Sequence, residues 1–112
     1  MLKIEAIVRE EAFNPIKNSL EEKDFVGMTV SDVIGRGKQK GLALKWRAGE
    51  HRVEFIPKKR IELVIEDKDL QIIVDAICEK GRTGEAGDGK IFILPVIDTI
   101  RIRTGEKGKE AI

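Results

Sequence analysis

The sequence predicts an α+β domain in which strands and helices follow the order βαββαβ. One reason is that apolar and charged residues alternate within residues 2–9 and 60–66, which is the period of a half-buried strand. Another is that apolar residues recur at helical spacing within residues 13–20 and 70–77. The chain has 112 residues, enough for one domain with a modest core.

The first strand and the first helix are expected within residues 2–27. The apolar side of the strand consists of Leu2, Ile4, Ala6 and Val8. Asn14 followed by Pro15 predicts a helix N-cap with a proline at the first helical position. We expect Gly27 to end this helix.

A second strand is expected over residues 28–34, ended by Gly35. After it, residues 37–54 show no sustained apolar period. A connection of about 15 to 20 residues without secondary structure is rare in a compact domain unless it is functional or disordered. We therefore expect a long, mobile hairpin arm.

The remaining elements are a third strand, a second helix and a further strand. Alternation predicts the strand over residues 61–65, and helical spacing predicts a helix over residues 70–81 that ends at a glycine. The continuous apolar run at residues 91–96 indicates a buried strand. Ile100 and Ile102, each next to an arginine, suggest a short final strand.

This order is the split βαβ arrangement of ferredoxin-like domains, an antiparallel sheet with both helices on one face. The other face of the sheet would leave a large apolar surface in water if the protein were a monomer. We therefore expect the sheets to pack on one another in a closed oligomer.

Composition excludes several classes of function. Lys and Arg number 21 against 20 Asp and Glu, so there is no strong field to hold a nucleic acid non-specifically. The longest apolar run, residues 91–97, is far shorter than the roughly 18 residues of a membrane span. The single cysteine, Cys78, cannot form an internal disulfide, and no leader-like segment opens the chain. These observations predict a cytoplasmic protein with no direct membrane insertion.

The strongest chemical signal is the segment Thr83–Phe92, in which three glycines and Lys90 precede an apolar run. Glycines allow successive backbone N–H groups to converge on an anion, and a lysine adds a point charge, so this segment could hold phosphate. A mobile turn between helix and strand is the alternative. With His51 as the only histidine, no Ser-His-Asp or Cys-His set can be assembled, and a zinc site lacks donors.

Four segments in their order and spacing closely resemble the nitrogen-regulatory PII signal-transduction proteins: Gly35–Gly41, Val53–Lys58, Thr83–Phe92 and Arg101–Arg103. The similarity runs from Met1 to Ile112. It implies a single PII domain that forms a homotrimer of ferredoxin-like subunits and binds ATP or ADP in three clefts between neighbours. It also implies a T-loop at about 37–54, a B-loop at about 82–90 and a C-loop region after 101.

The resemblance implies which residues bind the nucleotide. Gly87, Asp88, Gly89 and Lys90 would hold the phosphates from one subunit, and Arg101 and Arg103 would reach them from the neighbour. The implied nucleotide site as a whole consists of Thr29, Lys38, Val64, Gly87, Asp88, Gly89, Lys90, Arg101, Ile102 and Arg103. Lys38 replaces a more usual arginine, which keeps the charge and loses the bidentate fork.

The resemblance further implies that 2-oxoglutarate binds after Mg-ATP. Gln39 would complete the shell of a Mg²⁺ held by the ATP phosphates, and Lys58 would pair with the distal carboxylate of the keto acid. The implied 2-oxoglutarate site consists of Gln39, Lys40, Gly41 and Lys58.

A protein partner is implied as well, with Trp46, Arg47 and His51 at the tip of the arm as its contacts. The implied partner is an ammonium transporter, which would recruit this cytoplasmic protein to a membrane. His51 and Gly49 stand where relatives carry a modified tyrosine and a modified serine, so neither modification can occur there.

The expected role of the protein is non-enzymatic. The alternatives are regulation of a cytosolic enzyme, such as nitrogenase or an amino-acid kinase, and slow ATP hydrolysis with Glu85 or Asp88 as base.

Overall fold

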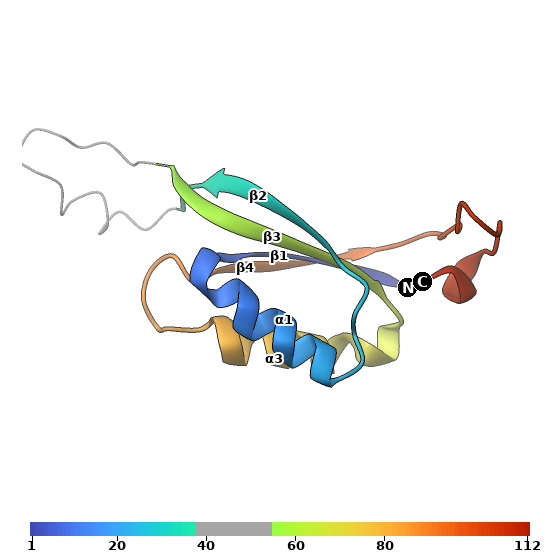
Figure 1. Cartoon of the computed structure of the whole chain (residues 1–112), viewed down its shortest axis with the longest axis horizontal. Coiled ribbons are helices and arrows are strands. Elements are labelled where there is room, and N and C mark those ends of the chain that lie inside the picture. Colours follow the sequence, from blue (N-terminus) through green and yellow to red (C-terminus); the bar gives the residue numbers. More distant parts are fainter. Residues whose placement is uncertain (38–54) are drawn as a thin grey trace, which may run out of the picture.

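The computed structural model describes residues 1–37 and 55–112, which form one sheet covered on one face by two helices (Figure 1). The elements are β1 (Leu2–Arg9), α1 (Phe13–Glu22), β2 (Thr29–Gly35), β3 (Ile56–Ile65), α3 (Leu70–Gly81) and β4 (Gly89–Pro95). The sheet is antiparallel with the strand order β2-β3-β1-β4. The predicted ferredoxin-like α+β fold is confirmed. None of the helices in this part of the chain is long and apolar enough to cross a bilayer.

The core lies between the sheet and the two helices. On the central strand β1, Ile4 pairs with Leu63 on one side and Ile93 on the other, and Ala6 pairs with Ile61 and Ile91. The alternation seen in the sequence therefore places the same face of three strands against the helices. The buried apolar side chains are Ile4, Ala6, Val8, Ala12, Ile16, Leu20, Ile61, Leu63, Ile65, Ile73, Ala76 and Ile77.

Both predicted ends of the first helix are wrong. A 3₁₀ turn over Glu10–Ala12 leads directly into α1, so the N-cap is Ala12 rather than Asn14, with no side-chain cap. Pro15 still falls in the first turn, where its missing N–H costs nothing. At the other end, Asp24 adopts a φ of 67°.

The C-terminal end of α1 is a Schellman motif. The Phe25 N–H donates to the Leu20 carbonyl at 2.9 Å and the Asp24 N–H donates to Glu21 at 3.0 Å. The helix therefore ends five residues before Gly27, because an aspartate rather than a glycine takes the left-handed position.

Strand β3 begins five residues earlier than its alternation predicted. Its first half pairs with β2, from Gly35 opposite Ile56 to Thr29 opposite Glu62. Pro57 is tolerated because the pairing of β3 with β1 stops at Lys58, so at Pro57 the strand has only one neighbour.

The predicted final strand is wrong. Ile100 forms only an isolated bridge to Lys107. Beyond it the chain turns, and the Gly105 N–H donates to the Arg101 carbonyl at 2.7 Å.

The helix-free face of the sheet is only partly apolar. Across β1 and β3, Lys3 pairs with Glu62 at 3.3 Å, and within β3 Arg60 pairs with the same carboxylate at 3.0 Å. Apolar side chains gather instead toward β4, where Phe92 and Leu94 are exposed. The expected large apolar surface is therefore interrupted by charged side chains, and the closed oligomer stays a prediction.

Candidate functional site

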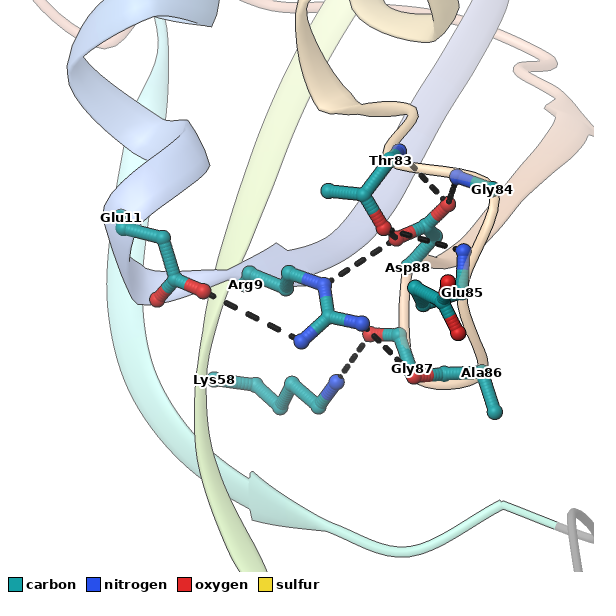
Figure 2. Close-up of polar contacts among 9 residues, drawn as sticks. All are labelled: Arg9, Glu11, Lys58, Thr83, Gly84, Glu85, Ala86, Gly87 and Asp88. Atoms are coloured by element: carbon teal, nitrogen blue, oxygen red, sulfur yellow. Dashed lines mark hydrogen bonds and ion pairs between the residues drawn. The ribbon is translucent and has the colours of Figure 1, made fainter. Parts of the chain in front are cut away.

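Residues 82–90, which are the loop between α3 and β4 and the first two residues of β4, lie against the ends of β1 and β3 (Figure 2). Arg9 is the last residue of β1, and Lys58 lies directly opposite it on β3. The register of two strands therefore delivers two cations to the same side of the loop. Both side chains contact loop carbonyl groups, as described below.

The carboxylate of Asp88 holds the loop in shape. Its Oδ2 accepts the backbone N–H of Thr83 at 2.8 Å and that of Gly84 at 2.9 Å. Its Oδ1 accepts the Thr83 hydroxyl at 2.5 Å and the Arg9 Nε–H at 3.1 Å. The Thr83 hydroxyl oxygen in turn accepts the N–H of Glu85 at 3.1 Å. These contacts close residues 83–88 into a ring.

These donors also determine the ionisation of Asp88. The hydrogen bonds from the side chain and backbone of Thr83, followed by those from Gly84 and Arg9, hold the pKa of the Asp88 carboxyl far below its usual range. The group is therefore a carboxylate whose oxygens are already in use within the loop.

The last glycine of the loop is required by a close backbone approach. Gly89 has a φ of 107°, and a Cβ built there would lie 1.8 Å from the carbonyl oxygen of Ile7 on β1. Any larger residue would push β4 away from β1 at the point where the loop joins the sheet. Gly87, with a φ of 100°, is also in a conformation that favours glycine.

Arg9 and Lys58 bring positive charge to the loop. The Arg9 Nη2–H donates to the Ala86 carbonyl at 2.6 Å, and the Lys58 ammonium donates to the Gly87 carbonyl. Lys58 is only 8% exposed. Burial, and then the nearby Arg9 charge, lower the pKa of Lys58. Arg9 is paired with the carboxylates of Asp88 and Glu11, whereas Lys58 is bonded to a carbonyl oxygen, so the Lys58 charge favours an anionic ligand.

The structure therefore brings together five of the residues that the sequence singled out. These are Lys58, Gly87, Asp88, Gly89 and Lys90, all in or against the loop. The side chain of Asp88 binds the loop itself, and the expected place of Asp88 in the nucleotide site stays a prediction.

Two other expected residues lie elsewhere on the same subunit. Thr29 opens β2 opposite Glu62, and Val64 lies two residues further along β3. Val64 is six residues from Lys58 on one strand, which corresponds to about 20 Å at the rise of a β-strand. Thr29 and Val64 therefore cannot reach the same ligand atoms as the loop of their own subunit.

The C-terminal segment is equally remote. In Figure 1 the residues after β4 lie at the end of the sheet opposite the 82–90 loop. Arg101 there binds Glu106 at 3.0 Å and donates to the Ile112 carbonyl at 3.3 Å, while Ile102 is fully exposed. One subunit alone does not bring Arg101 or Arg103 to the glycines. The other expected residues lie outside the described part of the chain: Lys38, Gln39, Lys40, Gly41, Trp46, Arg47 and His51.

Sequence reasoning missed Arg9 as a site residue. It closes an ordinary alternating strand, and its partners at Ala86 and Asp88 are 77 and 79 residues away. The one signal available was its position at the end of a predicted central strand, because strand ends and loops carry functional side chains more often than strand middles.

Fold and loop together define a ferredoxin-like domain with a glycine-rich loop that is flanked by the cations Arg9 and Lys58. The family model of nitrogen regulatory protein P-II matches residues 1–106. Nitrogen regulatory protein P-II 1 of Methanothermobacter thermautotrophicus is 49% identical over 112 residues, covering 100% of this chain and 97% of that protein. Nitrogen regulatory protein P-II of Synechocystis sp. is 48% identical, with 100% of both chains covered.

A solved structure agrees with these sequence matches. The crystal structure of Arabidopsis thaliana PII bound to citrate superposes with a TM-score of 0.80 at 40% identity, covering 99% of this chain and 91% of that one. The chain belongs to the nitrogen regulatory protein P-II (PII) family, whose members are regulatory signal proteins. The resemblance found in the sequence is thus confirmed.

Proposed function

We propose that this protein is a non-enzymatic sensor that binds ATP or ADP at the 82–90 loop and passes the signal to a target protein. The observation that carries the proposal is the loop geometry, with left-handed glycines at 84, 87 and 89 and the cations Arg9 and Lys58 against it. Replacing the water around a polyphosphate requires several cations and backbone donors. Lys58 and Lys90, which follows directly on Gly89, can supply cations, and Arg9 holds the loop through Asp88 and Ala86.

The nucleotide site is completed by a neighbouring subunit of a homotrimer. In support, Arg101 and Arg103 are remote from the loop of their own chain, and so are Thr29 and Val64. The exposed apolar side chains of β4, among them Phe92 and Leu94, offer a surface that a neighbour could cover. A head-to-tail interface that closes into a ring would place the arginines of one subunit at the glycines of the next.

The second effector is 2-oxoglutarate, bound with Mg-ATP. Lys58 supports this proposal, since it is a nearly buried cation beside the phosphate loop and can pair with a carboxylate. The Arabidopsis relative was solved with citrate, another polycarboxylate. Gln39, Lys40 and Gly41 would complete the site, with the Gln39 side-chain oxygen and the ATP phosphates holding Mg²⁺. The metal would bridge nucleotide and keto acid.

Catalysis is not part of the proposal. A general base must be free to accept a proton at neutral pH, whereas Asp88 has a strongly lowered pKa and four donors on its oxygens.

The output of the sensor is the binding of a target protein through residues 37–54, with Trp46, Arg47 and His51 as contacts and an ammonium transporter as the target. A cytosolic enzyme of nitrogen metabolism is the alternative target. Pull-downs from membrane vesicles and from soluble extract with ADP-loaded protein separate the two.

Titration calorimetry tests the effector scheme. ATP and ADP should each bind the protein alone, while 2-oxoglutarate should give heat only when Mg²⁺ and ATP are already present. Binding of the keto acid to nucleotide-free protein with the same affinity would reject the ordered scheme. Absence of any adenylate binding would reject the proposed function as a whole.

A further inference from the structure

We propose that Arg9 is a positioning residue, which sets the affinity for the nucleotide by holding the 82–90 loop through Asp88 without touching the ligand itself. The inference deepens the proposed function and rests on it. It assigns to the end of β1 a role that the glycine-rich segment alone does not suggest.

The contacts of Arg9 lie on both sides of Gly87, a residue in a backbone conformation that favours glycine. Its Nε–H donates to Asp88 at 3.1 Å and its Nη2–H donates to the carbonyl of Ala86 at 2.6 Å. These are the two neighbours of Gly87 in sequence, so one rigid guanidinium fixes the chain on both sides of a glycine whose φ is 100°. Figure 2 shows the guanidinium pointing into the loop from the strand end.

Asp88 extends this constraint to the start of the loop. Its second oxygen accepts the N–H groups of Thr83 and Gly84, so Arg9 is linked through one carboxylate to residues on both sides of the turn. Strand β1 is an inner strand of the sheet, paired with β3 from Leu2 to Arg9 and with β4 from Leu2 to Val8. Arg9 thus connects a glycine-rich turn to an inner strand of the sheet.

The expected effect follows from preorganisation. A glycine-rich turn that is free before binding must be ordered when the ligand arrives, and this lowers the affinity. Loss of the Arg9 contacts should therefore weaken ATP binding about tenfold, the order expected for ordering a short turn. Lysine cannot replace arginine here, because a single ammonium cannot donate to Asp88 and to Ala86 in the same fixed geometry.

The experiment measures ATP dissociation constants by calorimetry at several salt concentrations for the intact protein and for Arg9→Met, Arg9→Lys, Asp88→Asn and the double variant Arg9→Met/Asp88→Asn. The matched control is Glu11→Gln, which removes the other partner of Arg9, 3.9 Å from Nη1, and leaves the loop contacts in place. Hydrogen exchange of the Thr83 and Gly84 amides in the unliganded variants reports the loop directly.

We expect Arg9→Met and Arg9→Lys to weaken ATP binding to the same extent. The double variant should bind ATP no more weakly than the more defective of the two single variants, because the two residues act through one contact. The ATP dissociation constant of Glu11→Gln should stay within about twofold of that of the intact protein. In Arg9→Lys the salt dependence should be unchanged, since the charge is kept, and loop amides should exchange faster in both Arg9 variants. Three results overturn the inference: full affinity in Arg9→Met, rescue by Arg9→Lys, or additive losses in the double variant. If the unmodified protein takes up no ATP, the proposed function fails instead. If Arg9→Met does not fold, Arg9→Lys and the exchange data decide.

Discussion

The ammonium of Lys58 donates a hydrogen bond to the carbonyl oxygen of Gly87, so a residue proposed to bind the keto acid already contacts the loop proposed to bind phosphate. Lys58 is nearly buried at this point. A carboxylate that pairs with Lys58 must compete with, or share, the bond to Gly87. The two proposed effectors are therefore linked through one peptide group rather than through the length of the sheet.

Replacement of Lys58 by Met should abolish most 2-oxoglutarate binding while changing ATP binding less. Methionine keeps the apolar stem in its buried place and removes the charge, so the loss should be that of one charge-assisted hydrogen bond, about 1.5–3 kcal/mol. Calorimetry with Mg-ATP present measures the keto acid, and a separate titration measures ATP.

The adjacent lysine provides the control. Lys59 pairs with Asp32 on β2, on the opposite face of the strand, and Lys59→Met should leave both affinities almost unchanged. Equal losses of the keto acid in the two variants would show that overall charge, not the position of Lys58, controls binding.

The loop should add stability that disappears in acid. The folded-state pKa of Asp88 is lowered from the ordinary 3.8, mainly by the Thr83 hydrogen bonds, so the folded protein favours the charged carboxylate. That contribution is complete above about pH 5 and is lost as the pH falls below the ordinary value toward the folded-state pKa. The difference in free energy of unfolding between the original protein and Asp88→Asn, measured by urea, should therefore be constant near neutrality and shrink below about pH 4.

A second variant tests the cause of the lowered pKa. Thr83→Val removes the hydroxyl donor and keeps the carboxylate, so it should weaken the same pH dependence without eliminating it. If the difference in free energy of unfolding between the original protein and Asp88→Asn stayed constant down to about pH 2, these hydrogen bonds could not be the ones that stabilise the folded loop.

The sequence predicted the elements that depend on local period and missed those that depend on pairing. Strand β1 and helix α3 follow from their spacing alone. The first half of β3 was missed because Pro57 and three basic residues interrupt alternation, although β2 pairs with this half across the hairpin. The end of α1 was misplaced because the left-handed residue is Asp24, whereas glycine is the residue that the sequence signal identifies.

The site divides in the same way. Glycines and Lys90 were found because a turn that binds anions has a local signature. Arg9 could not be found, because its role depends on a contact across 79 residues that only the antiparallel register of β1 with β3 and β4 creates.

Gly89 should be the least replaceable residue of the loop. In Gly89→Ala, the new methyl group would overlap the Ile7 carbonyl at 1.8 Å and the φ of 107° would be strained, so a loss above about 3 kcal/mol, or failure to fold, is expected. In Gly84→Ala, the φ of 89° gives strain but the described residues leave open space around the Cβ, so about 1–2 kcal/mol should be lost. Urea unfolding compares the two, and equal losses would show that strain alone, without the contact to Ile7, accounts for the requirement.

Complementation between two defective variants should reveal a site shared by neighbouring subunits. Lys90→Met removes a cation at the loop, and Arg103→Met removes one in the C-terminal segment at the other end of the subunit. Each variant alone should lose most ATP binding, because every site lacks one cation. If the variants are unfolded and refolded together, half of the loops keep Lys90 and half of their neighbours keep Arg103, so about one quarter of the sites should bind ATP normally in a closed ring.

Calorimetric stoichiometry counts these sites, with each variant refolded alone as the control. A mixture that regains no sites would show that both residues act within one chain or that only one of them acts, and light scattering of the refolded mixture would show directly whether a trimer had formed.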